Sequence, residues 1–307
     1  MKLYPLLFEP LYFNKIWGGN KISRHFQRNL NSSGIGESWE LISNSSFSSK
    51  VTNGNLYGTS LKELFCKEIM GSYVSANYSY FPLLIKYIDA ADDLSVQVHP
   101  SHTIGKDTKN EMWYFIDAPE SGEIICGVDK DFSIQSIQES LCKMKVKRGD
   151  SVFIPSGAVH AITKGSFVLE IQEPTDITYR IYDWDRTNPD GTTRELHVEE
   201  AVKNTVTDYT ENDFVCNPAI MTGGNQAEIS LIKKCSHFTV EKWIVKRELK
   251  TTSRSDRFSI INVLSGTPSL ESDDHGMVLI PGDTVLIPAE LGSYTLYGPC
   301  ELIYSYV

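Results

Sequence analysis

Short stretches of alternating apolar and polar residues, separated by Gly, Pro, Asn and Asp, dominate this chain of 307 residues. Such alternation is typical of antiparallel strands that bury one face. We predict strands at 81–88, 95–98, 111–116, 123–126, 151–154, 167–171 and 178–182. Apolar residues recur at helical spacing in 59–69 and 134–142, and we expect a third helix at 195–203. Many strands and few helices predict an all-β protein built as a sandwich or a barrel.

A sequence repeat indicates two copies of one β-unit. Residues 148–155 read RGDSVFIP and residues 281–288 read PGDTVLIP. In both, a Gly-Asp turn leads into an alternating strand that stops at a proline. Five residues beyond the proline the first copy has His160, whereas the second has Ser293. We therefore expect a metal site in the first copy only, and a connection near the polar stretch 205–212.

The first copy continues into a motif that can hold a metal ligand. Gly149 and Pro155 are followed by Gly157 and His160, with the spacing of the second motif of the cupin superfamily. Glycine permits the turn into the strand and proline ends the ladder of hydrogen bonds. Gly157 lets the backbone bend so that the imidazole points inward. A histidine on a strand is often only a hydrogen-bonded core residue, so this motif needs partner ligands.

Candidate partners lie upstream on two other predicted strands. Gln97 and His99 are two residues apart and therefore project from the same face of a strand. Glu111 stands at the head of the next strand. With His160 they supply two imidazoles, a carboxylate and an amide oxygen, a set that suits zinc with one open position. Iron, manganese or nickel would also accept these ligands.

The sequence resembles the class I mannose-6-phosphate isomerases of the short bacterial type, a family of the cupin superfamily. The resemblance covers essentially the whole chain and rests on residues 16–19 (IWGG), 36–40 (GESWE), 81–86 (FPLLIK), 94–100 (LSVQVHP), 109–114 (KNEMWY), 155–160 (PSGAVH) and 170–186. The LSVQVHP and KNEMWY stretches are the most specific, because cupins in general lack them.

The resemblance implies two cupin-like jelly-roll barrels with a few short helices. Residues 1–205 would form the catalytic metal-binding domain, with N-terminal strands and a helical insert. Residues 206–307 would form a degenerate cupin-like domain. The implied activity is the zinc-dependent interconversion of mannose 6-phosphate and fructose 6-phosphate through an enediol. Two alternatives stay open: another phosphosugar-isomerising cupin, and a non-catalytic metal-containing cupin that binds sugar phosphates.

Residue roles follow from the same resemblance. One zinc ion per chain would be bound by His99, Glu111, His160 and, ranked last, Gln97. Arg180 and Lys109 would be catalytic, and Ser95, Lys86 and Glu170 would bind substrate, with Lys86, Lys109 and Ser95 as the expected phosphate contacts. For Lys86, which lies in an apolar strand, a buried ion pair with Asp89 or Glu170 is the alternative.

The general base is left open by the sequence, with Lys109, Glu170, Glu40 and a metal-bound water as candidates. The loop between His99 and Glu111 is shorter than in many relatives. It also carries an additional histidine, His102, which we expect to be exposed rather than a ligand.

The amino-acid composition limits the classes of binding partner and the cellular compartment that we expect. A net charge of −10 argues against nucleic acid or an acidic membrane surface, but a small phosphorylated substrate needs only a few local cations. Six cysteines without CxxC spacing favour reduced thiols in the cytosol. The apolar start is short and broken by two prolines, unlike a signal peptide. We expect a cytoplasmic monomer or homodimer acting on a phosphosugar, without nucleic-acid or membrane partners.

Overall fold

The structure, a computed structural model, describes residues 2–30, 32–101, 108–188, 190–273 and 275–307. Strands dominate and the helices are short, which confirms the all-β prediction. The chain forms two compact units, each assembled from separate segments. Unit 1 comprises Met1–Leu11, Trp39–Leu84 and Asn217–Val307, and unit 2 comprises Tyr12–Ser38 and Ile85–Cys216. The sequence-based division into continuous domains at residues 205 and 206 stays a prediction.

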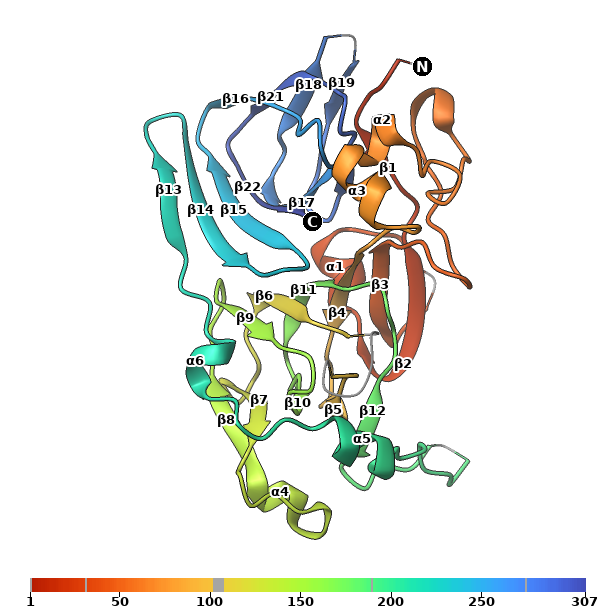
Figure 1. Cartoon of the computed structure of the whole chain (residues 1–307), viewed down its shortest axis with the longest axis vertical. Coiled ribbons are helices and arrows are strands. Elements are labelled where there is room, and N and C mark those ends of the chain that lie inside the picture. Colours follow the sequence, from red (N-terminus) through yellow and green to blue (C-terminus); the bar gives the residue numbers. More distant parts are fainter. Residues whose placement is uncertain (1, 31, 102–107, 189, 274) are drawn as a thin grey trace. The chain divides into compact units, whose positions relative to one another are not determined.

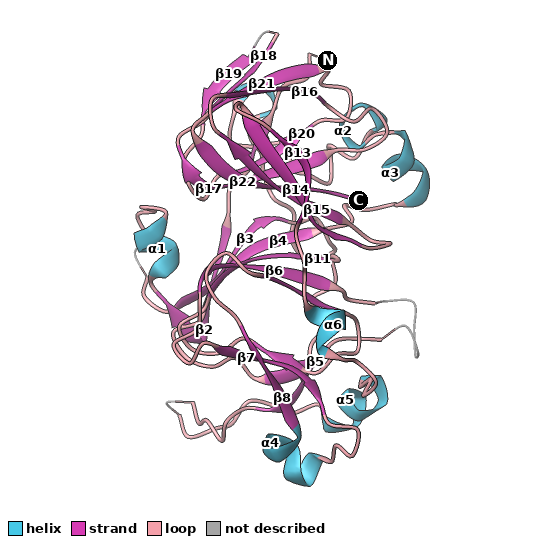
Figure 2. Ribbon diagram, turned by 90° about the vertical axis from the view of Figure 1, so that its left-hand side faces the viewer, coloured by secondary structure: helices cyan, strands magenta, loops and turns pink. Residues whose placement is uncertain are grey.

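Unit 2 contains two antiparallel sheets, which appear as two layers in Figure 2. The six-stranded sheet has the order β2 (Leu11–Gly19), β3 (Ile35–Leu41), β4 (Leu84–Asp89), β11 (Phe167–Gln172), β6 (Glu111–Asp117) and β9 (Ser151–Ile154). The five-stranded sheet has the order β12 (Tyr179–Tyr182), β5 (Val96–Val98), β10 (His160–Ala161), β7 (Glu123–Val128) and β8 (Leu141–Lys145). Every strand predicted in this part of the sequence is present, within a few residues at each end.

The core of unit 2 lies between these two sheets. Trp113 and Phe115 of β6 join Val168 of β11 in a buried cluster that also includes Ile124 and Met144 from the opposite sheet. Burying such side chains contributes about 1.5–3 kcal/mol each, and this fixes the inward face of every strand. A residue two positions from a core residue along a strand therefore also faces the interior of the barrel.

Short helices cover parts of unit 2: α1 (Lys21–His25), η2 (Ile134–Ser136), α4 (Ile137–Ser140), α5 (Val198–Asn204) and α6 (Glu211–Phe214). Helix α5 packs against β12 and α6 against β9, as Figure 1 shows. The helix predicted at 195–203 is confirmed as α5. The helix predicted at 134–142 is confirmed as η2 and α4, and it ends at Ser140 because Leu141 begins β8.

Unit 1 also has two antiparallel sheets. The seven-stranded sheet has the order β1 (Leu6–Leu7), β20 (Thr284–Ile287), β17 (Ser259–Gly266), β22 (Cys300–Tyr306), β15 (Thr239–Val245), β14 (Ala227–Lys234) and β13 (Ala219–Gly223). The four-stranded sheet has the order β16 (Glu248–Thr252), β21 (Ser293–Tyr297), β18 (Ser269–Ser272) and β19 (His275–Val278). The short helices of this unit are η1 (Gly54–Leu56), α2 (Lys67–Met70) and α3 (Ser72–Asn77).

The helix predicted at 59–69 is wrong for most of its length. Residues 61–64 form turns, and only α2 is helical. The Glu63 carboxylate accepts hydrogen bonds from the backbone N and the hydroxyl of Ser60, at 2.9 and 2.6 Å. Such local side-chain bonds compete with helix formation. Leu61 and Leu64 are buried nonetheless, so the apolar spacing reflects a packed turn.

The sequence repeat corresponds to the same turn in both units. Gly149 and Gly282 have positive φ values of 87° and 94°, which glycine adopts without strain. Asp150 and Asp283 each accept a hydrogen bond from the backbone N three residues earlier, at 3.0 and 2.9 Å. The turns lead into β9 and β20, so each unit contains one copy of the repeated element.

Candidate active site

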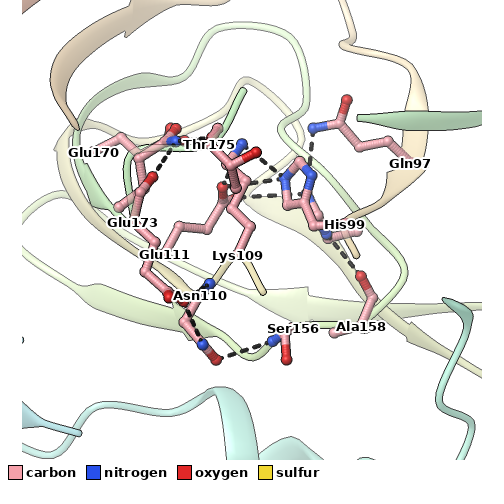
Figure 3. A network of polar contacts seen from close by, with 12 residues as sticks. Gln97, His99, Lys109, Asn110, Glu111, Ser156, Ala158, Glu170, Glu173 and Thr175 are labelled. Carbon is pink, nitrogen blue, oxygen red and sulfur yellow. Dashed lines mark hydrogen bonds and ion pairs between the residues drawn. The ribbon is translucent and has the colours of Figure 1, made fainter. Parts of the chain in front are cut away.

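Three buried side chains converge inside the barrel of unit 2. Glu111 begins β6, His160 begins β10, and His99 directly follows β5. One ligand atom from each lies within 4.8 Å of the other two, and Figure 3 shows His99 and Glu111 facing each other. Among the described residues this is the cluster that could hold a metal ion. The sequence prediction of these three as neighbours is therefore confirmed.

Backbone carbonyls orient both imidazoles. The Nδ1 atom of His99 lies 3.0 Å from the carbonyl oxygen of Ile177, and that of His160 lies 2.8 Å from the oxygen of Ala158. A carbonyl can only accept, so we assign the proton to Nδ1 in each ring, which leaves Nε2 unprotonated and able to accept a hydrogen bond or to bind a metal. The Nε2 atoms then point at Glu111, at 3.1 Å for His99 and 3.4 Å for His160.

The Glu111 carboxylate provides the test of whether a cation fits here. The residue is 1% exposed, and neither carboxylate oxygen accepts a hydrogen bond from the described part of the chain. A buried carboxylate without hydrogen bonds is costly. The Lys109 ammonium approaches Oε2 at 3.2 Å, but the remaining directions face the imidazole lone pairs. Two neutral nitrogen donors and an anionic oxygen fit a divalent cation.

Protonation states in the site suit metal binding. Burial, assisted by the charge of Lys109, lowers the pKa of His99 to about 3. Burial also lowers the pKa of His160. Burial acts to raise the pKa of Glu111, but Lys109 and the imidazoles outweigh it and hold that pKa well below its usual value. At neutral pH the site therefore presents two neutral imidazoles and one carboxylate, the forms that ligate metals.

Gln97, the predicted fourth ligand, lies beside the three. It is the cross-strand partner of His160, and its Nε2 atom is 3.2 Å from the His160 Nε2 atom. Amide oxygen and nitrogen are assigned from hydrogen bonding, and a flip of the amide would turn Oε1 toward the site. Ligation by Gln97 stays a prediction. On the other side of β5, Gln97 pairs with Arg180 of β12. His160, Gln97 and Arg180 are therefore aligned across three neighbouring strands of the sheet.

A cavity of about 290 Å³ opens beside this cluster. The predicted site residues among its lining are Lys86, Ser95, Gln97, Lys109, Glu111, Glu170 and Arg180. Glu40, a candidate base in the sequence analysis, is not among the lining residues. His102 lies outside the described residues. The fold thus brings the predicted catalytic and substrate-binding residues to one cavity, although they come from separate strands.

Lys86 and Glu170 form a buried ion pair in the cavity wall. The Nζ atom of Lys86 lies 2.9 Å from Glu170 Oε1, and the indole of Trp113 donates to Glu170 Oε2 at 2.8 Å. Burial and the charge of Glu111 raise the pKa of Glu170 to about 7. Burial acts to lower the pKa of Lys86, but Glu170 and neighbouring carboxylates raise it overall. The alternative that the sequence left open, a buried pairing with Glu170, is confirmed.

Several residues of the cavity wall were not among the predicted site residues. Lys15 and Glu37 form an ion pair of 3.0 Å there. Glu37 lies within the family-like stretch 36–40 and Lys15 directly precedes the stretch 16–19, which was an available signal. Arg194 also lines the cavity. It lies in a long irregular segment after β12, where no strand periodicity indicates an orientation.

A second set of missed residues supports the ligands from behind. The Asn110 side chain accepts a hydrogen bond from Ser156 N at 3.0 Å and donates one to Glu173 at 2.7 Å. Figure 3 shows this link between the start of β6 and the turn that precedes His160. No pattern in the local sequence predicted this hydrogen-bonded link.

The barrel is of the cupin type, and its two histidines and one glutamate form a cluster that could hold a metal ion. Two family models match the chain: "Phosphomannose isomerase type I, catalytic domain" over residues 6–135, and "Mannose-6-phosphate isomerase, cupin domain" over residues 227–307. No helix in the described ranges has the length and apolar character needed to cross a membrane.

Similar proteins extend the match to the full length. The chain is 34% identical to the mannose-6-phosphate isomerase ManA of Bacillus subtilis, covering 100% of both chains, and 34% identical to that of Streptococcus mutans, covering 98% of both. The crystal structure of a mannose 6-phosphate isomerase from Bacillus subtilis superposes with a TM-score of 0.89 at 31% identity, covering 99% of this chain and 100% of that one. The chain belongs to the type I phosphomannose isomerase family of enzymes.

Proposed function

We propose that this protein is a zinc-dependent aldose–ketose isomerase that interconverts mannose 6-phosphate and fructose 6-phosphate through an enediol. The observation that carries the proposal is the convergence of His99, Glu111 and His160 beside a cavity that also contains Lys109 and Arg180. Family membership supports the same substrates. The open side of the ligand set leaves room for sugar oxygens, as in catalytic rather than structural metal sites.

The reaction moves one proton between neighbouring carbons of the open-chain sugar. A base takes the proton from C2 of mannose 6-phosphate, and the electron pair forms a C1–C2 double bond while the C1 oxygen takes up a proton. Return of a proton to C1, with loss of the proton on the C2 oxygen, gives fructose 6-phosphate. Negative charge develops on the sugar oxygens, so the site must supply positive charge there.

His99, Glu111 and His160 would hold the metal, with Gln97 as a fourth ligand. A zinc ion held by these residues would supply a fixed positive charge, which would stabilise negative charge that develops on the sugar oxygens by several kcal/mol. The donor set fits zinc and also other first-row metals, so zinc rests on the resemblance to the family.

The remaining residues bind, orient and move protons. Lys109 lies 3.1 Å from the Nε2 atom of His99, so its ammonium group would donate hydrogen bonds to sugar oxygens bound there. Glu170 lines the same cavity, and its raised pKa of about 7 suits proton transfer near neutral pH. Ser95 and Lys86 would bind sugar hydroxyls. Arg180 would hold the open chain, since its guanidinium stays charged at any working pH.

A coupled assay for fructose 6-phosphate, with and without a chelator, tests the proposal. We expect turnover of mannose 6-phosphate by the purified protein, loss of turnover after chelation, and recovery with added zinc. Turnover of another aldose phosphate but not of mannose 6-phosphate would favour a different isomerase. Binding of mannose 6-phosphate without any turnover would favour the non-catalytic alternative. The cytoplasmic location, the oligomeric state and the lack of nucleic-acid partners stay predictions.

A further inference from the structure

The indole of Trp113 lies between a candidate metal ligand and the buried ion pair of Lys86 and Glu170. Trp113 follows Glu111 by two positions on β6, so both side chains face the interior of the barrel. Trp113 is 0% exposed to solvent and is part of the cavity wall. Its ring meets the ring of His160 edge to face, with 5.5 Å between the ring centroids and an angle of 67° between the planes.

The carboxylate of Glu170 has one donor at each oxygen. The Trp113 indole N–H donates to Oε2 at 2.8 Å, and the Nζ atom of Lys86 lies 2.9 Å from Oε1. The last torsion of a glutamate side chain has broad energy minima, so the plane of a carboxylate is set by its partners rather than by its rotamer. The indole N–H therefore fixes the direction in which Oε1 points.

Lys86 in turn depends on Glu170 for its position. The residue is 4% exposed, and among the described residues its ammonium is paired with Glu170 alone. An ammonium carries three N–H donors at the end of a flexible stem of four carbons. One donor is directed at Glu170, which leaves two for a ligand in the cavity that Lys86 lines. Their direction is set by where Oε1 of Glu170 stands.

We propose that Trp113 is a positioning residue for Lys86, on which it acts through Glu170. The inference rests on the proposed function for the role of Lys86 in substrate binding. The indole N–H orients the carboxylate, and the carboxylate holds the ammonium where it donates to substrate oxygens. Phenylalanine at residue 113 would keep an aromatic ring in the barrel but would leave Oε2 of Glu170 as a buried acceptor without a donor.

Unit 1 contains a matching tryptophan–glutamate pair. The Trp243 indole N–H donates to Glu241 Oε2, also at 2.8 Å, and the two residues are 4% and 5% exposed. The other oxygen of Glu241 accepts a hydrogen bond from the hydroxyl of Tyr306 at 3.2 Å. Neither member of the pair is among the described residues that line the candidate active-site cavity. Trp243→Phe therefore removes a comparable hydrogen bond away from the proposed chemistry, and it serves as the matched control.

Steady-state kinetics, with the bound metal measured in each variant, provide the first test. Trp113→Phe should lower kcat/KM for mannose 6-phosphate about 10- to 100-fold at unchanged metal content, because misplacing a functional group by about 1 Å can cost about 10²-fold. Trp243→Phe should stay within about threefold of the wild type. A Trp113→Phe variant with wild-type kcat/KM would overturn the proposal.

A double-mutant cycle separates positioning from a general loss of stability. If Trp113 acts through Lys86, adding Trp113→Phe to Lys86→Gln should lower kcat/KM no further than Lys86→Gln does by itself. Trp113→Tyr, with a larger ring, replaces Trp113→Phe throughout if the latter does not fold. Effects of the two substitutions that multiply in the double variant would show that Trp113 acts independently of Lys86, against the proposal.

The mobility of the Lys86 ammonium provides a readout that does not require turnover. Relaxation of ¹⁵N in the lysine ammonium groups gives an order parameter for each of them, and the Lys86 signal is assigned by its absence from Lys86→Gln. We expect Lys86 to be rigid in the wild type and in Trp243→Phe, and mobile in Trp113→Phe. Equal rigidity in all three proteins would refute the positioning role. Mobility gained in Trp113→Phe, combined with no isomerase activity in the wild type, would uphold the positioning of Lys86 and reject the proposed function.

Discussion

Asn110 accepts a hydrogen bond from the backbone N of Ser156 at 3.0 Å, and this bond joins the residue before Glu111 to the turn that leads to His160. Two candidate metal ligands from strands of different sheets are thereby held in a fixed relation. The Asn110 backbone and side chain also donate to Glu173, at 2.8 and 2.7 Å. The site is therefore supported by a polar link that is itself partly buried.

Replacing Asn110 with alanine should weaken metal binding more than it weakens the fold. Loss of these hydrogen bonds is expected to cost about 1–3 kcal/mol in the free energy of unfolding. Loss of a supporting contact typically reduces metal affinity 10- to 100-fold. Chemical denaturation and a competitive zinc titration measure the two effects. Asn14→Ala, at an exposed asparagine, is the control, and equal zinc affinity in both variants would contradict the positioning role.

His160→Ala should remove both the bound metal and the isomerase activity. The substitution deletes one of two imidazoles in a site of three residues, and two remaining ligands bind a divalent cation weakly. Elemental analysis of the purified variant and the coupled assay provide the measurements. His25→Ala, at an exposed histidine, should retain both properties. A His160 variant with full metal content and normal turnover would refute the assignment.

Arg180→Ala should keep the metal but lose catalytic efficiency. The guanidinium lines the cavity without contacting the proposed ligand atoms, so the metal content should equal that of the wild type. Loss of a charged group that holds the open chain should lower kcat/KM by about 10²-fold or more. Normal kcat/KM at wild-type metal content would show that Arg180 is part of the scaffold only.

Gly157→Ala should be more damaging than Gly191→Ala, although both glycines have nearly the same positive φ, 83° and 82°. A side chain in this conformation costs about 1–3 kcal/mol at either position. A Cβ atom at residue 157 would lie 2.8 Å from the Asn204 oxygen, whereas at residue 191 no atom of the described residues would lie within 4 Å of it. The difference in unfolding free energy between the two variants measures the cost of the steric overlap at residue 157.

Because Gly157 belongs to the turn that aims His160, its variant should also bind zinc more weakly. Equal unfolding free energies and equal zinc affinities in the two glycine variants would mean that the turn adjusts without moving the imidazole.

Asp183 should make the stability of the protein depend on acid. Burial acts to raise the pKa of Asp183, but hydrogen bonds from Arg194 and Arg186 outweigh it and lower that pKa. A folded-state pKa below the unfolded value of about 3.9 stabilises the protein above that pH, and this stabilisation disappears as pH falls through the folded-state pKa. Asp183→Asn should therefore destabilise the protein at pH 6, and the difference from the wild type should shrink below about pH 4.

Unfolding free energies at pH 6 and pH 3 measure this effect, with the exposed Asp131→Asn as the control. A difference between wild type and Asp183→Asn that stays constant over this range would indicate that the carboxylate contributes no more than a neutral amide does.

Strand alternation and the cupin-like spacing were sufficient to predict most strands of unit 2 and the metal cluster. The inward face of a strand is a local property, so the common face of Gln97 and His99 could be deduced from their spacing alone. The helix predicted at 59–69 failed because a packed turn and a helix share the same apolar spacing, and the hydrogen bonds of Glu63 decided between them.

The sequence by itself determined which residues are the candidates for the chemistry: the histidines, Glu111, the two lysines and Arg180. Only the tertiary structure decided what these residues contact. It paired Lys86 with Glu170, placed Arg194 beside Arg180, and divided the chain into units of separate segments. The physical reason is that strand pairing joins residues distant in sequence. A periodic pattern along one strand specifies its buried face but not the strand that lies beside it.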